Sequence, residues 1–189
     1  MIHIPTLVEA DTFRGIFDIV ANKATNDSVL VEVGTFLGGS ICYLAQRIRD
    51  NNKSPQIYCV DTWDFSNIGK DHQYMIDNKT SKFDNFWQNI EKCSLQDIIK
   101  PLIGDSIKVS SSFKDKSIDF IFLDGCHDEE YVYSELEAWY PKMKDNSWIS
   151  GHDYNDAGVR RAVQKFFLSK QHEISQHGES YLAKIGEGI

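Results

Sequence analysis

The stretch VLVEVGTFLGGSICYLAQ, residues 29–46, decides the fold of this chain. It opens with a β-branched run, passes through a turn that contains glycines, and ends with apolar residues at helical spacing. A second strand-like run, IYCVD at residues 57–61, ends in the acid Asp61. A strand, a glycine turn, a helix, a strand and an acid in this order are typical of a doubly wound α/β sheet that binds a nucleoside at the carboxyl ends of its strands.

The positions of the glycines bear on the kind of nucleoside. In the dinucleotide fingerprint G-x-G-x-x-G, the second glycine lets the backbone approach a pyrophosphate. Here Gly34 is followed two residues later by Phe36, and a bulky side chain at that position disfavours NAD. S-Adenosylmethionine (SAM) has no phosphate, and we expect its carboxylate at the N-terminus of the following helix and its ammonium near Glu32. The alternative is a structural turn without a ligand, because glycine at a tight turn also has purely conformational uses.

Composition limits the class of protein. The chain has 189 residues, 41% of them hydrophobic and 25% charged, and a net charge of −8. These values predict a single soluble domain over residues 1–189 whose surface is a poor match for nucleic acid or an anionic membrane. No signal peptide and no apolar run of about 18 residues are visible. The four cysteines form no C-x-x-C pair, so we expect reduced thiols and a cytoplasmic location.

Hydrophobic periodicity predicts that strands and helices alternate along the chain. Strands are expected at residues 29–33, 56–61, 100–103, 118–124 and 147–151. Helices are expected at residues 6–25, within an N-terminal helical segment 1–27, and at 40–49, 83–94, 129–140 and 158–169. Residues 173–185 can form an antiparallel pair of strands at the end of the chain. The connection 62–82 is long, polar and aromatic, and we interpret it as a candidate substrate lid carrying Trp63, Phe65, His72 and Tyr74.

Alternating strands and helices imply a parallel sheet whose ligands bind outside the carboxyl ends of the strands. Asp61, which ends the second strand, can accept hydrogen bonds from both ribose hydroxyls, or can cap the irregular segment instead. Asp105 or Ser106, after the third strand, can bind the amine of an adenine ring, or can cap the next helix. The sequence leaves these alternatives open.

A second group of polar residues follows two neighbouring strands. FLDGCHDEEY at residues 122–131 places Asp124 and His127 after a buried strand, and the following acids are favoured at the start of a helix. SGHDYND at residues 150–156 places His152 and Asp153 after the next strand. The two strand ends are expected to bring these four side chains together.

Two carboxylates and two imidazoles at one edge can hold a divalent metal or supply a general base. Carboxylates alone suit Mg²⁺ or Ca²⁺, whereas imidazole favours Mn²⁺, Fe²⁺ or Zn²⁺. The alternative is a hydrogen-bonded network without metal, with His127 or His152 as the base.

Six motifs occur in the order found in a known family, over about residues 29–168. They are EVGTFLGGS (32–40), VDTW (60–63), GDS (104–106), FLDGCH (122–127) with Tyr131, GHDY (151–154) and GVRRAVQKF (158–166). With these motifs the chain resembles class I SAM-dependent methyltransferases. Within that class it is similar to a small bacterial group related to macrocin-type sugar O-methyltransferases and cephalosporin hydroxylase-like proteins.

The resemblance implies a Rossmann-like α/β fold with a seven-stranded mixed sheet in the order 3-2-1-4-5-7-6 and helices on both faces. It implies SAM contacts at Glu32, Gly34, Ser40, Asp61 and Ser106. The full set of candidate cofactor-binding residues adds Thr35, Phe36, Gly38, Thr62, Asp105 and Asp124.

The resemblance also implies a divalent metal, usually Mg²⁺, held by Asp124, His152 and Asp153, and the donor types leave Mn²⁺ and Ca²⁺ as alternatives. His152 stands where the sugar enzymes have an acid, and Cys126 stands where they have a proposed acidic base. A neutral thiol is a weaker base than a carboxylate, so these two differences favour His127.

The sequence thus predicts a methyltransferase that methylates a small-molecule acceptor, most simply at a hydroxyl, with His127, Asp153 and Asp124 as catalytic residues. Arg160 or Arg161 could meet an acidic group of the acceptor, or could be solvated surface charges. Two alternatives are a hydroxylase-like enzyme on the same scaffold and a non-catalytic SAM-binding or assembly protein. Association into a homo-oligomer is a further expectation, and no partner other than the acceptor is indicated.

Overall fold

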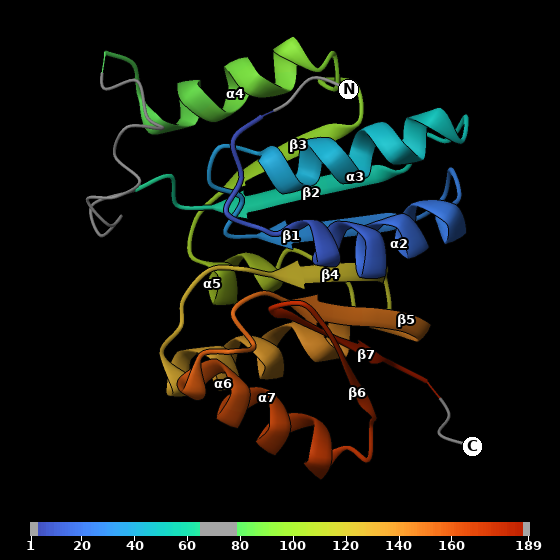
Figure 1. The fold of residues 1–189 in the computed structure, drawn as a ribbon, viewed down its shortest axis with the longest axis vertical. Coiled ribbons are helices and arrows are strands. Elements are labelled where there is room, and N and C mark those ends of the chain that lie inside the picture. The colour runs from blue at the N-terminus through green and yellow to red at the C-terminus, as the bar shows by residue number, and fades with distance from the viewer. Residues whose placement is uncertain (1–3, 65–78, 187–189) are drawn as a thin grey trace.

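A computed structural model describes residues 4–64 and 79–186 of the chain. Its centre is a seven-stranded sheet in the order β3-β2-β1-β4-β5-β7-β6 (Figure 1), which confirms the predicted order. The strands are β1 (Val29–Val33), β2 (Gln56–Asp61), β3 (Ile99–Ile103), β4 (Ile118–Leu123), β5 (Met143–Gly151), β6 (Ile174–His177) and β7 (Ser180–Lys184). The first five are parallel, whereas β7 runs antiparallel to both β5 and β6.

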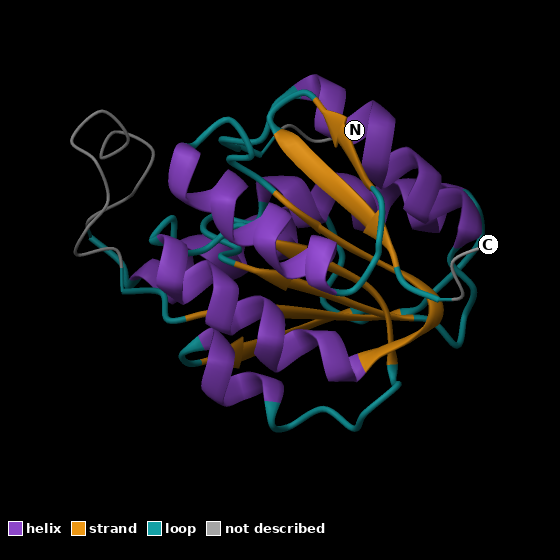
Figure 2. Cartoon of the chain, turned by 90° about the horizontal axis from the view of Figure 1, so that it is seen from below, coloured by secondary structure: helices purple, strands orange, loops and turns teal. Residues whose placement is uncertain are grey.

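Helices cover both faces of the sheet, as Figure 2 shows from below. They are α1 (Ala10–Thr12), η1 (Phe13–Phe17), α2 (Asp18–Lys23), α3 (Gly39–Asp50), α4 (Lys82–Lys92), α5 (Ser106–Ser110), α6 (Glu129–Trp139), η3 (Tyr140–Lys142) and α7 (Ala157–Ser169). Helices α2, α3 and α4 contribute to the apolar core on one face, and α6 and α7 to the core on the other. Successive residues of β1 alternate between the two cores, since Leu30 belongs to the first and Val31 to the second.

Most element boundaries agree with the sequence prediction within a few residues, and two differ more. The N-terminal helical segment begins at Ala10 instead of residue 6, and η1 within it is a π-helix. Strand β5 begins at Met143, four residues before the predicted start, and pairs with Ile118 there. Among the described residues, no helix is long and apolar enough to cross a membrane.

The turn after β1 brings the ends of β1 and β4 into close contact. Gly34 has φ +75°, and a Cβ at this position would lie 1.9 Å from the carbonyl oxygen of Asp124. Glycine is therefore required here by both backbone conformation and space. Two residues later Phe36 also has a positive φ, 50°, so a phenylalanine occupies a left-handed position that favours glycine. Gly39, which opens α3, leaves room for the backbone of Pro5 to cross the helix start.

Candidate active site

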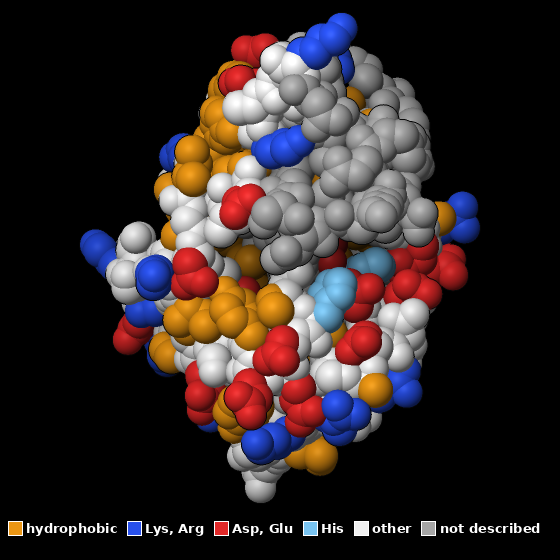
Figure 3. Space-filling view, turned by 90° about the vertical axis from the view of Figure 1, so that its left-hand side faces the viewer, with side chains coloured by type: hydrophobic (Ala, Val, Ile, Leu, Met, Phe, Trp, Pro, Cys, Tyr) orange, Lys and Arg blue, Asp and Glu red, His pale blue; other side chains and the backbone are white. Residues whose placement is uncertain are grey.

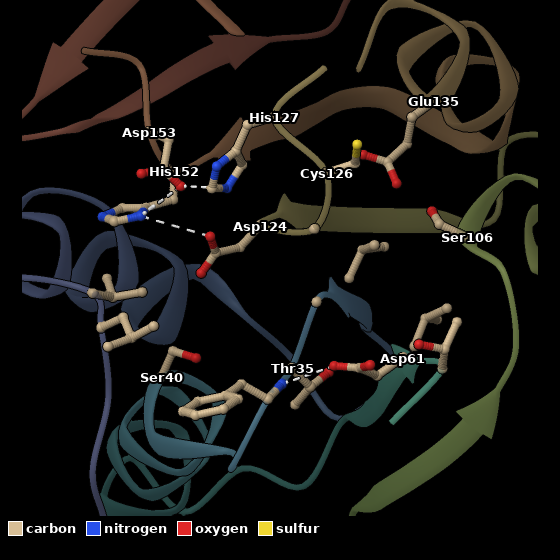
Figure 4. A pocket seen from close by; sticks show the side chains of 18 of the residues that line it. Thr35, Ser40, Asp61, Ser106, Asp124, Cys126, His127, Glu135, His152 and Asp153 are labelled. Atoms are coloured by element: carbon tan, nitrogen blue, oxygen red, sulfur yellow. Dashed lines mark hydrogen bonds and ion pairs between the residues drawn. The ribbon is translucent and has the colours of Figure 1, made fainter. Parts of the chain in front are cut away.

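A cavity of about 780 Å³ opens at the carboxyl ends of β1, β2 and β4. Figure 4 shows the side chains that line it, and Figure 3 shows histidine and acidic side chains gathered on this face of the molecule. Most of the predicted cofactor-binding residues line the cavity, namely Gly34, Thr35, Phe36, Ser40, Asp61, Thr62, Asp105, Ser106 and Asp124. The N-terminal segment contributes Pro5, Thr6, Leu7 and Val8 to its wall.

Glu32 and Gly38 were also predicted to contact the cofactor, but neither lines the cavity. The side chain of Glu32 is 1% exposed, and its Oε1 accepts a hydrogen bond of 2.5 Å from the hydroxyl of Ser40. Burial raises the pKa of Glu32 well above its usual value. Gly38 packs against Phe86 of α4 instead. In this part of the cavity the polar surface is therefore the Ser40 hydroxyl, and Glu32 lies beneath it.

Asp61 lies at the end of β2 and connects two loops. Its Oδ2 accepts a hydrogen bond from the N–H of Phe36 at 2.9 Å, and its Oδ1 accepts one from the N–H of Trp63 at 2.8 Å. Burial raises the pKa of Asp61, and these backbone hydrogen bonds oppose that effect. Each carboxylate oxygen has a second lone pair, so Asp61 can hold the loops and still accept hydrogen bonds from a ligand.

Asp105 caps a helix, which was one of the two predicted alternatives. Its Oδ1 accepts from the N–H of Lys108 at 3.1 Å, and its Oδ2 accepts from the hydroxyl of Tyr131 at 2.9 Å. Ser106 accepts a hydrogen bond of 2.8 Å from the indole N–H of Trp139. Both residues line the cavity, but their side chains already have partners within the protein.

Glu135 on α6 also lines this part of the cavity and was not predicted from the sequence. It is 2% exposed, and burial raises its pKa to about 7. Tyr131, Glu135 and Trp139 are spaced by four residues along the helix, so they share one face. This spacing is the sequence feature that could have placed Glu135 on the same helix face as Tyr131.

Asp124, His127, His152 and Asp153 lie together, as predicted from the two strand ends (Figure 4). The Nδ1 of His152 lies 3.2 Å from Oδ2 of Asp153 and 3.6 Å from Oδ1 of Asp124. The Nε2 of His127 lies 2.9 Å from the same Asp153 oxygen. One ligand atom from each of Asp124, His152 and Asp153 lies within 4.8 Å of the others, which is close enough for one metal ion.

Glu9 completes this cluster from the N-terminal segment. Its Oε2 lies 2.7 Å from the Nε2 of His152. Glu9, His152 and Glu179 form a second group of ligand atoms within 4.8 Å of one another. No local sequence pattern indicates a contact between residues 143 positions apart in the chain.

The pKa values within the cluster reflect opposing effects. Burial raises the pKa of Asp124 to about 7, even though His152 opposes the shift. For His152, burial lowers the pKa, but Asp153, Asp124 and Glu9 outweigh it and raise the value to about 9. The hydrogen bond to Asp153 raises the pKa of His127. Burial raises the pKa of Asp153, but contacts with both imidazoles bring it well below its usual value.

The predicted lid lies mostly beyond the described part of the chain. Phe65, His72 and Tyr74 are outside the described residues. Trp63 is buried at 6% exposure, and its ring packs edge-on against Phe83 and at a tilted angle against Phe86, both on α4. It does not line the cavity, so Trp63 is part of the apolar core instead of facing a substrate there.

The sequence also points to the two arginines of α7 and to the four cysteines. Arg160 donates a hydrogen bond to the carbonyl of Tyr154, and Arg161 forms an ion pair of 2.6 Å with Glu129. Neither arginine lines the cavity. All four cysteines are free, as predicted: Cys42, Cys59 and Cys93 are buried, and Cys126 is exposed at the cavity.

Known proteins share this architecture. Among solved structures, the O-methyltransferase NovP has a TM-score of 0.72 with 18% identity, covering 96% of this chain and 82% of NovP. The O-methyltransferase TomG from Streptomyces achromogenes, solved in complex with SAM, has a TM-score of 0.66 with 10% identity, covering 95% of this chain and 82% of TomG. At these identities the likeness shows the fold.

Sequence comparison identifies the family. The chain is 27% identical over 152 residues to the protein R132 of Acanthamoeba polyphaga mimivirus, and 22% identical over 144 residues to the protein y4gI of Sinorhizobium fredii. These matches cover 77% and 74% of this chain, but only 62% and 14% of the two relatives. A family model described as a methyltransferase domain matches residues 31–154. That match runs from within β1 to the loop after β5 and covers more than half of the chain, including the carboxyl ends of β1 to β5. The chain therefore belongs to the methyltransferase-domain family.

Proposed function

We propose that this methyltransferase uses SAM to methylate a hydroxyl group of a small-molecule acceptor. The observation that carries the proposal is one continuous cavity with a nucleoside-type end at Asp61 and a cluster of acids and imidazoles at Asp124 and His127. The volume of about 780 Å³ falls within the usual range for small-molecule sites. The O-methyltransferase activity of NovP and TomG, and the SAM bound to TomG, support the same assignment.

The residues at the first end of the cavity fit SAM. Asp61 has lone pairs for the ribose hydroxyls, and Gly34 keeps the turn after β1 free of a side chain. Ser40 lies in the first turn of α3, where the helix dipole favours the carboxylate of the methionine part. Bound there, SAM supplies an electrophilic methyl group on its sulfonium. The protein then contributes by aligning the acceptor oxygen with that methyl and by excluding water.

The residues at the second end can take a proton from the acceptor. The Nε2 of His127 is held by Asp153 at 2.9 Å, which leaves Nδ1 as the nitrogen that accepts the proton. Asp153 has a lowered pKa and is a weak base, so it serves to orient His127 and to stabilise its protonated form. This pairing of a base with an orienting carboxylate is a common arrangement for general-base catalysis.

The same centre fits a divalent metal. Asp124, Asp153 and the Nδ1 of His152 would be the ligands, while Glu9 accepts a hydrogen bond from the Nε2–H of the same ring. Such an outer carboxylate commonly fixes the orientation of a metal-binding histidine. Carboxylate oxygens with one imidazole suit Mg²⁺ and Mn²⁺. A metal held there would lower the pKa of a bound acceptor hydroxyl.

Calorimetry with SAM and with S-adenosylhomocysteine tests the cofactor, and release of S-adenosylhomocysteine from a panel of alcohols, phenols and sugars tests the reaction. Parallel assays with EDTA separate metal-dependent from metal-independent turnover. We expect His127→Gln to lower kcat at least about a hundredfold and to leave the affinity for S-adenosylhomocysteine unchanged. His172→Gln, outside the cavity, is the control. Absence of binding to both nucleosides would refute the proposal, and binding without turnover on any acceptor would favour a non-catalytic SAM-binding protein.

A further inference from the structure

Glu135 has no role in the chemistry described so far, although it is a buried acid on the cavity wall. Its carboxyl points toward the space between Cys126 and Ser106 (Figure 4). Among the described residues, its Oε1 has no hydrogen-bond partner. A buried carboxyl with an unpartnered oxygen is costly. Because Glu135 lines the cavity, a ligand group that donates to this carboxyl would offset that cost.

We infer that Glu135 selects the base of the bound nucleoside by accepting a hydrogen bond from the exocyclic 6-amino group of adenine. This inference rests on the proposed use of SAM, because it concerns the base of that same ligand. It assigns to a residue of α6 a contact that the sequence motifs suggest for Asp105 or Ser106.

The positions of the two alternative acceptors support this assignment. Both oxygens of Asp105 accept hydrogen bonds within the protein, from the N–H of Lys108 and the hydroxyl of Tyr131. The Ser106 oxygen accepts from Trp139, and its hydroxyl faces Glu135 and stabilises the ionised form of that carboxyl. Trp139 therefore donates to Ser106, and Ser106 donates to Glu135. The carboxyl of Glu135 is the last acceptor in this chain of hydrogen bonds.

The charge around Glu135 is consistent with a ligand that donates a hydrogen bond. The carboxyl is 2% exposed, and no described Lys, Arg or His side chain pairs with it. The nearby titratable groups are Asp105, Tyr131 and Tyr181, and none of these is a cation. An amine that enters the cavity can therefore donate to Glu135 without displacing an existing ion pair.

This arrangement predicts selection between purines. Adenine presents an N–H donor at position 6, whereas hypoxanthine and guanine present a carbonyl acceptor there. Above the Glu135 pKa of about 7, that carbonyl would face an ionised carboxylate with no hydrogen between them. A site built to bind a donor rejects a ligand that lacks it more strongly than an apolar pocket does.

A thermodynamic cycle tests the inference by binding alone, without turnover. Calorimetry at pH 8, above the Glu135 pKa of about 7, compares S-adenosylhomocysteine with its analogue in which hydrogen replaces the 6-amino group, and with S-inosylhomocysteine. A hydrogen bond to a carboxylate corresponds to a preference of about tenfold to a hundredfold. We expect wild-type protein to prefer the adenine compound by this factor, and Glu135→Leu to reduce the preference to about twofold or less. Glu135→Gln should retain the preference over the analogue with hydrogen at position 6, since the amide oxygen also accepts. It should discriminate less against S-inosylhomocysteine, since the amide N–H can donate to the carbonyl.

Glu137→Gln is the matched control, because Glu137 is exposed on the same helix. Circular dichroism and cooperative unfolding verify that each variant is folded. Equal affinity of the wild-type protein for S-adenosylhomocysteine and for the analogue with hydrogen in place of the 6-amino group would overturn the inference without any variant. The wild-type preference retained in a folded Glu135→Leu protein would overturn it as well. Failure to bind any of the three compounds would instead refute the proposed use of SAM.

Discussion

The Nε2 of His152 lies 2.7 Å from the Oε2 of Glu9, and this contact joins the N-terminal segment to the acidic centre. The other carboxylate oxygen of Glu9 accepts hydrogen bonds from the hydroxyl of Thr12 at 2.6 Å and from the N–H of Glu179 at 2.8 Å. Glu9 thus connects α1, the β6–β7 turn and the end of β5. Because the Nε2 of His152 is hydrogen-bonded to Glu9, its imidazole presents Nδ1 to Asp124 and Asp153.

Replacing Glu9 with glutamine should lower the pKa of His152. The amide keeps an acceptor for the Nε2–H but removes a negative charge that raises this pKa to about 9 in the wild-type protein. A raised histidine pKa contributes stability that is present below the unfolded value of about 6.5 and is lost as the pH rises through the folded value. The stability contributed by His152 should therefore be lost at a lower pH in Glu9→Gln than in the wild-type protein. NMR titration of the imidazole and urea unfolding against pH measure both effects.

Asp11→Asn is the control for this variant, since Asp11 is an exposed acid on α1. It should leave the titration of His152 at its wild-type position. An identical His152 titration in the wild-type protein and in Glu9→Gln would show that the contact with Glu9 does not form in solution.

Metal binding should depend on Asp124 and not on Glu179. Both residues belong to groups that share His152, but Asp124 is largely buried beside Asp153 whereas Glu179 is exposed. We expect Asp124→Asn to weaken Mn²⁺ binding at least about tenfold and Glu179→Gln to leave it unchanged. Calorimetry and the electron paramagnetic resonance of Mn²⁺ provide the measurement. The reverse ranking would place the ion between Glu9 and Glu179, and a wild-type protein that binds no Mn²⁺ would favour the metal-free network.

The sequence was sufficient for the sheet and for the residues that follow its strands. Asp61, Asp124, His127 and Asp153 were predicted together because parallel strands end at one edge, and this geometry follows from the order of the elements. The contact of Glu9 with His152 could not be predicted, because it depends on how the N-terminal segment crosses the completed sheet. Such long-range packing leaves no local pattern.

The placement of Glu32 could have been predicted more closely. Alternate residues of a strand point to opposite faces, so Glu32 shares its face with Leu30, which α3 covers. The acid therefore points into the layer beneath Ser40 and away from the cavity opening. For Asp105 the sequence leaves two alternatives open, because the choice depends on Tyr131, a residue from a different helix.

Gly34→Ala should destabilise the protein severely. A Cβ there would lie 1.9 Å from the Asp124 carbonyl oxygen, and the backbone has φ +75°. Strain and overpacking together should reduce the free energy of unfolding by about 2–4 kcal/mol, which urea unfolding measures. Gly125→Ala is the matched control, because its Cβ would meet only Val33 at 3.6 Å and Glu135 at 4.0 Å. Equal stability of the two variants would be incompatible with the close approach of β1 and β4.

Glu135 also supports a prediction about stability. Burial raises its pKa to about 7, above the value of about 4.3 for an unfolded glutamate. Between these values the unfolded chain is ionised at this position while the folded protein is protonated, so this residue lowers wild-type stability as the pH rises toward 7. Glu135→Gln removes the titration and keeps the shape of the side chain. The stability of the variant relative to wild type should therefore increase by about 2–3 kcal/mol between pH 5 and pH 8.

Urea unfolding of the ligand-free protein at several pH values within this range measures that difference. The control is again Glu137→Gln, because Glu137 is exposed on the same helix. Parallel pH dependences for the two variants would mean that Glu135 is hydrated in solution. A relative stability of Glu135→Gln that falls as the pH rises would mean that an unidentified cation pairs with the carboxylate. Either result would remove the unpartnered acid from the wall of the cavity, and with it the reason to expect a donor group on the bound base.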